Sequence, residues 1–497
     1  MTKKLLFLSA MVLMLSSCEG ALDDVFGEWS RPTPPAVTSI MLNETKLTKM
    51  VGDDAFTLTA TVNADATDKT LVWTSDKPGV LNVDANGVVT IQGQGLATIT
   101  VTATNGTEST ADDKTATCEV AVFKTVNLAE LTGDYQAKDY DMLTGVLHDL
   151  DQMYKISIPD GATITLGGIE IEGYNLGRNT WAGLTCLGDA TIILAEGTSN
   201  KVRGFQSNHP GIYVPSGKTL TIQGSGSLTA SSHGAGAGIG GGSGIPCGNI
   251  IINGGSINAT GGDGAAGIGG GNGGACGNIT INSGNITANG STNAAAIGGG
   301  SSGSASCGVI TITGGTINAN GGNGGAGIGS GGNLSVCGDI IISGGDITAQ
   351  GIDAAGIGTG SDGKCGNISI TGGTISATGG NWAAGIGGGI WGKCGNITIA
   401  KTITSVTATK GNNSTPGSNT DPYSIGVGSD DADYDTSIPQ VSCGDIILGT
   451  DVKTFTPQWN HDGTNNNSWT YSPAPVSGTN YGGLTLTISG DTWTLQP

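Results

Sequence analysis

The sequence CGNITINSGNITANG, residues 276–290, is one unit of a repeat that runs with small changes from about Gly234 to Ala400. Apolar residues alternate with polar ones on both sides of its Ser-Gly pair, which is the two-residue period of a β-strand. The cysteine that opens the unit recurs every 28 to 31 residues, at Cys247, Cys276, Cys307, Cys337, Cys365 and Cys394. A period of this length, built from short strands and glycine turns, predicts a solenoid.

Each unit also holds a third apolar piece, Ala-Gly-Ile or a close variant, bracketed by glycines. Three short strands joined by tight bends form one coil of a parallel β-helix, in which each isoleucine stacks on its counterpart about 4.8 Å away. A left-handed helix needs a strict six-residue period, which is not found. A calcium-binding roll needs repeated Gly-Gly-x-Gly-x-Asp, which residues 261–264 and 321–324 only approach. We therefore predict a right-handed parallel β-helix.

The Ala-Gly-Ile equivalents mark the length of this β-helix. They begin at Ala182-Gly183-Leu184 and end at Ser424-Ile425-Gly426, which gives about nine coils within residues 125–450. Residues 451–497 are richer in aromatic side chains. We expect them to form a β cap that closes the open edge of the solenoid.

Cysteines in register lie one above another along such a solenoid. At a coil spacing of about 4.8 Å, parallel side chains keep the Cβ atoms farther apart than a disulfide prefers. A buried ladder of thiols is therefore favoured over a chain of disulfides. A metal site is less favoured, because no histidine falls between Gly234 and Ala400 and no Cys-x-x-Cys occurs.

Residues 1–17 have the features of an export signal, because two lysines precede an apolar run too short to span a bilayer. The run ends Leu15-Ser16-Ser17-Cys18, which resembles the lipobox of bacterial lipoproteins. The resemblance implies cleavage before Cys18 and lipid attachment to its thiol; ordinary secretion is the alternative. Acidic residues after Cys18 resemble the export tags of Gram-negative surface lipoproteins. The expected location is thus the outer membrane or cell surface, with membrane contact through the lipid alone and residues 18–35 as a linker.

Residues 36–123 differ in composition from the repeat. Short alternating runs are separated by turns such as Asp-Lys-Pro-Gly, at the spacing of a β-sandwich. The segments LVWTSD at 71–76, VDANGVVT at 83–90 and GLATIT at 95–100 resemble the bacterial Ig-like group 2 (BIG2) family. That resemblance implies an Ig-like domain used as a spacer on the cell surface. Trp73 is expected in its core.

The composition argues against nucleic acid as a partner. The chain has 497 residues, 20 basic against 40 acidic side chains and a net charge of −20, and only three of the basic residues are arginines. Nucleic acid is therefore not an expected partner. The acidic run Asp430, Asp431, Asp433 and Asp435 has two interpretations, a solvated surface turn or a calcium site. No other cofactor is expected.

An enzyme needs clustered reactive groups, since β-helix lyases and hydrolases use paired carboxylates or a basic residue beside calcium. The central repeats contain no Glu, Arg or His, and their aspartates are scattered over glycine turns. The less regular early coils hold further candidates, Arg178, Asp189, Arg203 and His209. We predict a non-catalytic protein and retain a polysaccharide lyase or glycoside hydrolase as the alternative.

Binding has better candidates. Outward positions of the repeat form a polar face rich in Thr, Asn and Ser, and Trp382, Trp391 and Trp181 stand at glycine corners. An aromatic ring at such a corner either stacks on a sugar or packs locally. The repeats also resemble glycine-rich β-helical surface proteins described as carbohydrate-binding or adhesin-like. The predicted function is a cell-surface lipoprotein that binds polysaccharide, host glycan or extracellular matrix. A structural cell-envelope protein and an ice-binding threonine array are further alternatives.

Overall fold

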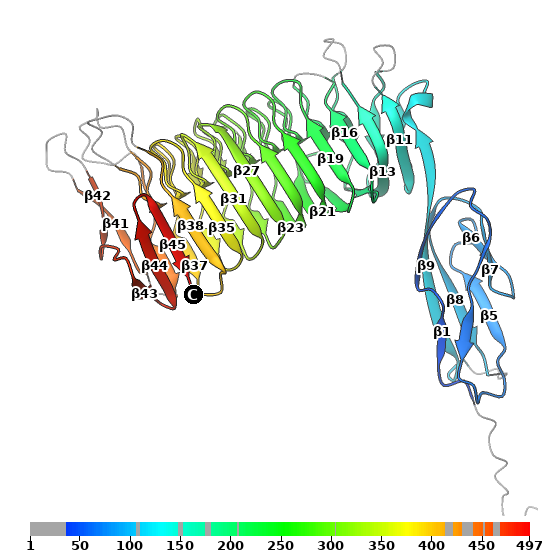
Figure 1. Cartoon of the computed structure of the whole chain (residues 1–497). Coiled ribbons are helices and arrows are strands. Elements are labelled where there is room, and N and C mark those ends of the chain that lie inside the picture. Colours follow the sequence, from blue (N-terminus) through cyan, green and yellow to red (C-terminus); the bar gives the residue numbers. More distant parts are fainter. Residues whose placement is uncertain are drawn as a thin grey trace, which may run out of the picture. The chain divides into compact units, whose positions relative to one another are not determined.

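The computed structural model describes residues 36–105, 110–147, 153–173, 180–205, 208–303, 305–412, 421–429, 441–450, 453–460 and 468–497. The described chain is β-structure apart from one 3-10 turn, Leu128–Glu130. It divides into two compact units, with the boundary between Val122 and Phe123, and each is described by itself (Figure 1). The prediction of an all-β chain is confirmed.

The first unit is a β-sandwich. One sheet joins β5 (Leu71–Ser75), β8 (Gly95–Ala103), β9 (Lys114–Asn127) and β2 (Lys46–Met50). The opposing strands are β3 (Phe56–Thr57), β7 (Val88–Ile91) and β6 (Leu81–Val83), with the pair β1 (Ile40–Leu42) and β4 (Ala60–Val62). Inward-facing residues such as Leu81, Val89 and Ile99 are fully buried, and Trp73 packs against them as predicted.

The second unit is a parallel β-solenoid, and one of its faces is a continuous sheet of eleven short strands. Its strands are β10 (Tyr135–Gln136), β12 (Ile156–Ile158), β14 (Leu184–Cys186), β17 (Ile212–Tyr213), β20 (Ile239–Gly240), β22 (Ile268–Gly269), β24 (Ile297–Gly298), β28 (Ile328–Gly329), β32 (Ile357–Gly358), β36 (Ile386–Gly387) and β39 (Ile425–Gly426). The nine from β14 onward follow the Ala-Gly-Ile motif and its variants, in agreement with the predicted number of coils. β10 and β12 are two earlier rungs that lack the motif.

Two further parallel series complete the coils. The first contains β13 (Ala162–Ile171), β15 (Ala190–Leu194), β18 (Thr219–Gly224), β21 (Asn249–Thr260), β23 (Ile279–Asn289), β26 (Ile310–Ile312), β30 (Ile340–Ile342), β34 (Ile368–Ile370), β37 (Ile397–Ala400) and β40 (Ile446–Gly449). The second adds β16 (Ser199–Arg203), β19 (Ser227–Ser231), β27 (Thr316–Asn323), β31 (Asp346–Ile352), β35 (Thr374–Thr378) and β38 (Ser405–Thr409). The long strands β13, β21 and β23 belong to both series, and β11 (Asp141–Leu147) pairs with β13 at the first coil.

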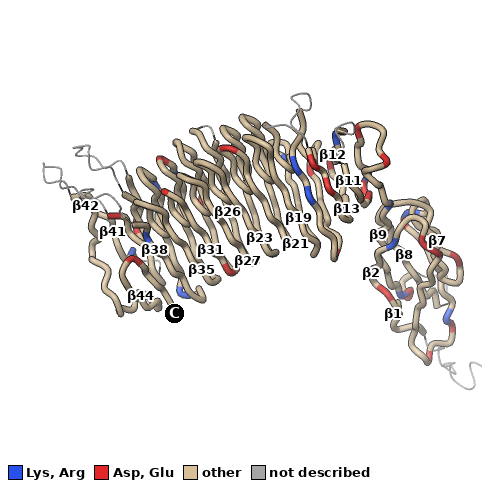
Figure 2. The backbone as a smooth tube through the Cα atoms, turned by 45° about the horizontal axis from the view of Figure 1, so that its top comes forward, with Lys and Arg blue, Asp and Glu red and all other residues tan. Residues whose placement is uncertain are grey.

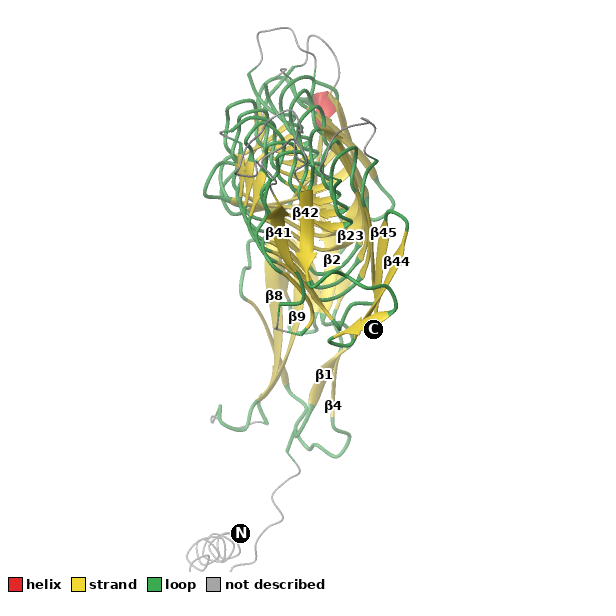
Figure 3. Cartoon of the chain, turned by 90° about the vertical axis from the view of Figure 1, so that its left-hand side faces the viewer, coloured by secondary structure: helices red, strands yellow, loops and turns green. Residues whose placement is uncertain are grey.

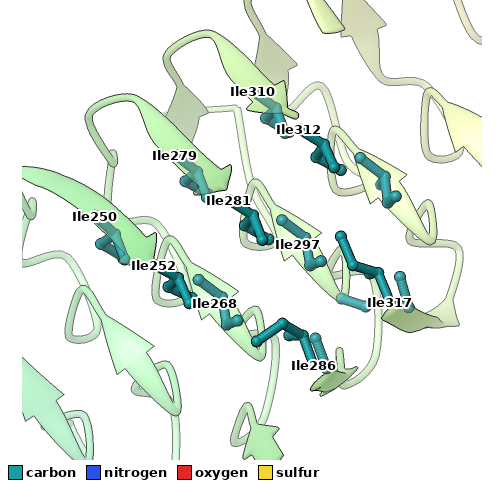
Figure 4. Close-up of a cluster of buried hydrophobic side chains, with 14 of the residues drawn as sticks. Ile250, Ile252, Ile268, Ile279, Ile281, Ile286, Ile297, Ile310, Ile312 and Ile317 are labelled. Atoms are coloured by element: carbon teal, nitrogen blue, oxygen red, sulfur yellow. The ribbon is translucent and has the colours of Figure 1, made fainter. Parts of the chain in front are cut away.

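The core is a set of isoleucine columns. Ile250, Ile279 and Ile310 are in register on successive strands, as are Ile252, Ile281 and Ile312, and all are fully buried. Figure 4 shows these side chains side by side in the interior. Burying one such side chain contributes about 1.5–3 kcal/mol, so each added coil supplies its own apolar stabilisation.

The repeat cysteines form a column of free thiols, as predicted. A short sheet of β25 (Ser306–Cys307), β29 (Val336–Cys337) and β33 (Lys364–Cys365) carries three of them, and the Sγ atoms of Cys276 and Cys307 are 2.9 Å apart. Burial, together with the nearby thiols of Cys394 and Cys337, raises the pKa of Cys365 well above its ordinary value. The thiol of Cys365 is therefore protonated at neutral pH and is a poor nucleophile.

The C-terminal residues cover the last coil. β45 (Thr492–Gln496) pairs antiparallel with β38 and with β44 (Leu484–Ser489), which pairs with β43 (Thr479–Tyr481). A hairpin of β41 (Thr456–Asn460) and β42 (Ser468–Ser472) lies in front of the coils in Figure 3. The buried aromatic residues Phe455, Tyr471 and Trp493 join the core, so this end of the parallel stack is closed by antiparallel strands.

Candidate functional site

Three polar columns run along the second series of strands, where the prediction placed a polar face. The outer two pass through Ser256, Asn285 and Thr316 and through Thr260, Asn289 and Asn320. Asn289 Nδ2 lies 3.4 Å from Thr260 Oγ1, and Asn320 Nδ2 donates to Asn289 Oδ1 at 3.0 Å. These groups satisfy part of one another's hydrogen-bonding capacity, and the central coils carry few charges (Figure 2). The face is a flat, largely neutral hydrogen-bonding surface.

Trp181 lies just before β14, in one of the irregular early coils. Its carbonyl accepts a hydrogen bond from the N–H of Phe205 at 3.2 Å, and the two ring centroids are 5.9 Å apart. The indole packs partly buried against the solenoid core. Packing against Phe205 and the solenoid core therefore fixes the side chain of Trp181, which also lines a pocket.

This pocket, which we call the Trp181 pocket, has a volume of about 170 Å³. Four successive coils contribute to its lining: Lys155, Thr180, Trp181, Ala182, Thr185, His209, Tyr213 and Ile245. Thr185 and Tyr213 are paired neighbours on β14 and β17. The aromatic rings of Trp181 and Tyr213 and several hydrogen-bonding side chains thus line one small cavity.

Two buried polar atoms of this lining have no hydrogen-bond partner among the described residues. They are the indole Nε1 of Trp181 and the hydroxyl Oγ1 of Thr185. A buried polar group without a partner costs about 1–3 kcal/mol, and native structures contain few of them. Two such atoms on lining residues of one pocket mark it as a candidate binding site.

The electrostatics of the Trp181 pocket are simple. Among the described lining residues, Lys155 is the one with a permanent charge, and none of them carries a carboxylate. Burial, followed by the charge of Lys155, lowers the pKa of His209, so this imidazole is neutral at pH 7. The phenol of Tyr213 donates to the carbonyl of Pro246 at 3.3 Å, and burial raises its pKa. The pocket is therefore rich in donors.

Trp382 and Trp391 stand at two corners with left-handed backbone, at φ of 56° and 50°. In the preceding coils, the position of Trp382 is held by Gly264, Asn293, Gly324 and Asp353, all with positive φ. The position of Trp391 is held by Gly273, Ser302, Asn333 and Asp362. A bulky side chain at such a position is uncommon and costs about 1–3 kcal/mol.

The two tryptophans are neighbours in space. The N–H of Ser429 donates to the carbonyl of Trp382 at 2.7 Å, and the N–H of Trp391 donates to the carbonyl of Ser429 at 3.2 Å. Both indoles are half-buried. Because other coils build the same corners with small or polar residues, these rings are not required by the backbone path.

The corners at Trp382 and Trp391 are expected to tolerate asparagine. We expect the double variant Trp382→Asn, Trp391→Asn to melt no lower than the wild type, because asparagine tolerates the left-handed region and already holds both corners at Asn293 and Asn333. We expect its affinity for glycan to fall, because stacking area is lost. Calorimetric melting and glycan titration measure the two effects. Early unfolding would show that the rings are core, and unchanged binding would remove them from the site.

Other predicted site residues are not brought together. Arg203 pairs with Glu172 at 2.7 Å, and Asp189 accepts from the N–H of Thr219 at 2.8 Å. Of the early-coil candidates in the described residues, His209 alone lines the Trp181 pocket. Cys18, Arg178 and the run Asp430, Asp431, Asp433 and Asp435 lie outside the described residues.

The described residues offer neither a metal-binding cluster nor a helix that could span a membrane. No group of three or more His, Cys, Asp or Glu side chains is placed there to hold a metal ion. No helix in that part of the chain has the length and apolar composition needed to cross a membrane.

Sequence reasoning found Trp181 and His209 but missed the other lining residues, among them Lys155, Thr185 and Tyr213. They come from different coils outside the regular repeat. The in-register spacing of Thr185 and Tyr213 after their variant Ala-Gly-Ile motifs was a usable signal for placing these two together.

Comparison with known families agrees with the two units. The model of the intimin immunoglobulin-like domain matches residues 58–105. The β-helix repeat model matches residues 220–243, 250–272, 279–301, 310–332, 340–361 and 368–390. No curated protein matches the chain. The chain thus carries an Ig-like domain followed by a β-helix, as predicted, a combination that suggests a surface adhesin-like or carbohydrate-active protein.

Proposed function

We propose that this protein is a non-catalytic carbohydrate-binding protein of the cell surface, anchored through a lipid on Cys18. The observation that carries the proposal is the Trp181 pocket, where two buried polar atoms lack partners in a cavity lined by aromatic rings. Sugars present apolar C–H faces and hydroxyl groups, which need these two kinds of surface. The occupant is a saccharide unit of a polysaccharide, a host glycan or a matrix glycan.

The pocket supplies each part of this recognition. The ring of Trp181 or Tyr213 offers apolar area, and removing that area from water contributes roughly 25 cal/mol per Å². The indole N–H, the Thr185 hydroxyl and the Lys155 ammonium are donors for ring and hydroxyl oxygens.

The alternative of a lyase or hydrolase is weaker at this site. Glycoside hydrolysis uses two carboxyl groups about 5–10 Å apart, and the described lining residues of the Trp181 pocket include neither Asp nor Glu. His209, Lys155 and Tyr213 are acid–base candidates, but no carboxylate stands beside them among the described lining residues. The arrangement therefore favours binding over bond cleavage.

Thr185→Val tests the proposal because it removes one hydroxyl and keeps the shape of the side chain. Affinity for the bound glycan is expected to fall about three- to tenfold, the value of one hydrogen bond. The melting temperature is expected to stay level or rise, because the lost hydroxyl has no partner in the described structure. Titration calorimetry and thermal melting provide the two readouts.

Thr287→Val is the matched control, since Thr287 lies outward on the polar face of β23. It should leave the affinity unchanged. If Thr287→Val weakens binding and Thr185→Val does not, the polar face is the site and the Trp181 pocket is not. A Trp181→Ala variant is less informative, because Trp181 also packs against the core.

A further inference from the structure

A second and larger pocket lies where the last coil meets the C-terminal strands. Its volume is about 540 Å³, roughly three times that of the Trp181 pocket, and we call it the cap pocket. Its lining includes Lys410, Asp421, Tyr423, Trp469 and Trp493. These residues come from the ends of β38 and β39 and from β42 and β45, so segments far apart in sequence build it together.

The charged and polar groups of the cap pocket are held by ion pairs and hydrogen bonds. Lys410 Nζ lies 3.7 Å from Asp421 Oδ2 and 3.5 Å from Asp491 Oδ1. The backbone N–H of Lys410 donates to the carbonyl of Asp491 at 3.0 Å, and the Ser424 hydroxyl donates to the same carbonyl at 2.7 Å. The lysine side chain is only 22% exposed. Its ammonium is therefore held in one place beside the cavity.

The aromatic part is equally fixed. The Tyr423 hydroxyl donates to the carbonyl of Trp469 at 2.9 Å, and its ring packs edge-on against Trp493 with centroids 6.5 Å apart. Burial, then the charge of Asp421, raises the pKa of Tyr423, so the phenol remains a donor at neutral pH. The Nε1 of Trp469 is buried and has no hydrogen-bond partner among the described residues.

The charge of the cap pocket differs from that of the Trp181 pocket. Among the described residues, the lining holds the ammonium of Lys410 and the carboxylate of Asp421, and Asp491, which is not in the lining, brings a second carboxylate to Lys410, so the charge around this ammonium is negative. An anionic ligand is repelled there, whereas hydroxyl groups can donate to the carboxylates and accept from Lys410. Fixed aromatic side chains, an unpartnered indole N–H and charged acceptors together fit an uncharged polyhydroxylated molecule.

We propose that the cap pocket is a second saccharide site that takes an uncharged oligosaccharide segment of two or more rings. The size of the cavity, the indole N–H of Trp469 and the carboxylates around Lys410 carry this assignment. It extends the proposed carbohydrate binding to another part of the chain, but the two sites are built from separate residues and can fail separately.

The test uses the full chain with Cys18→Ser, which avoids the lipid, and variants of it. Cellohexaose, maltohexaose, xylohexaose and laminarihexaose are titrated as uncharged probes, and hexagalacturonate as an anionic one. At least one uncharged hexasaccharide should bind, and Trp469→Phe should weaken that binding about three- to tenfold. This substitution keeps an aromatic ring and removes the N–H, so the melting temperature should change little. Thr287→Val, a substitution outside the linings of both pockets, should leave the binding of that same probe unchanged.

Other outcomes contradict the cap pocket assignment alone or both proposals. If the wild type binds none of the four uncharged probes, the cap pocket assignment is wrong. It is also wrong if Trp469→Phe leaves binding unchanged, or if Thr185→Val removes all binding. In that last case, or if hexagalacturonate alone binds and Thr185→Val weakens it, the proposed function stands without a cap site. Absence of binding to every probe in this set and on a broad glycan array would overturn both proposals.

Discussion

Gly329→Val is expected to abolish cooperative folding of the solenoid. Gly329 ends β28 with φ of +139°, and a Cβ atom there would lie 1.9 Å from the carbonyl oxygen of Gly358 in the next coil. The same close approach recurs at Gly298 and Gly387, so the coils from β20 to β39 are built on this contact. A side chain would force two coils apart in the centre of the core. We expect a loss above about 4 kcal/mol, the range reserved for severe core damage.

Gly133→Val is the matched control for this substitution. Gly133 belongs to the same unit, its backbone is not in the left-handed region, and a Cβ atom there would meet nothing within 4 Å. Circular dichroism during thermal unfolding compares the two variants. A Gly329→Val protein that melts within a few degrees of the control would contradict the tight coil stacking.

Cys18→Ser should eliminate lipid attachment completely. The thiol of Cys18 is the only acceptor that the lipobox-like sequence Leu15-Ser16-Ser17-Cys18 provides, and serine cannot replace it as a thioether donor. Metabolic labelling with a radioactive fatty acid should show a labelled wild type and an unlabelled variant that is released from membranes. Cys118→Ser serves as control and should remain labelled, because Cys118 is buried in the first unit. Equal labelling of wild type and Cys18→Ser would end the lipoprotein proposal.

The solenoid could be predicted from the sequence because each repeat of the sequence corresponds to one coil of the structure. Ile279 and Ile281 point inward because they alternate with polar residues, and their partners in the neighbouring coils recur at the same phase. The cysteine period likewise predicted a ladder of buried thiols. Such patterns need no knowledge of long-range contacts, because each coil repeats the last.

The sites were harder to predict because they lie where the repeat is broken. Thr185 is marked as special by a hydroxyl without a partner, which is a property of the three-dimensional surroundings. Trp382 and Trp391 were selected for their position on glycine turns, but their left-handed backbone appears only in the structure. Residues 451–497 were assigned to closing the solenoid. The cap pocket, which includes Lys410 and Trp469, depends on how the antiparallel C-terminal strands pack on the last coil. These strands lie outside the repeat, so its periodicity does not predict their packing.

The central claim is that this β-helix binds carbohydrate without cleaving it. A glycan array probed with the full Cys18→Ser chain, with and without chelator, followed by reducing-sugar release assays on every polymer retained, tests it most directly. We predict retention of at least one glycan class, weakened by Thr185→Val, with no new reducing ends. An array without a retained glycan would contradict binding, and release of reducing ends from a retained polymer would contradict a non-catalytic role.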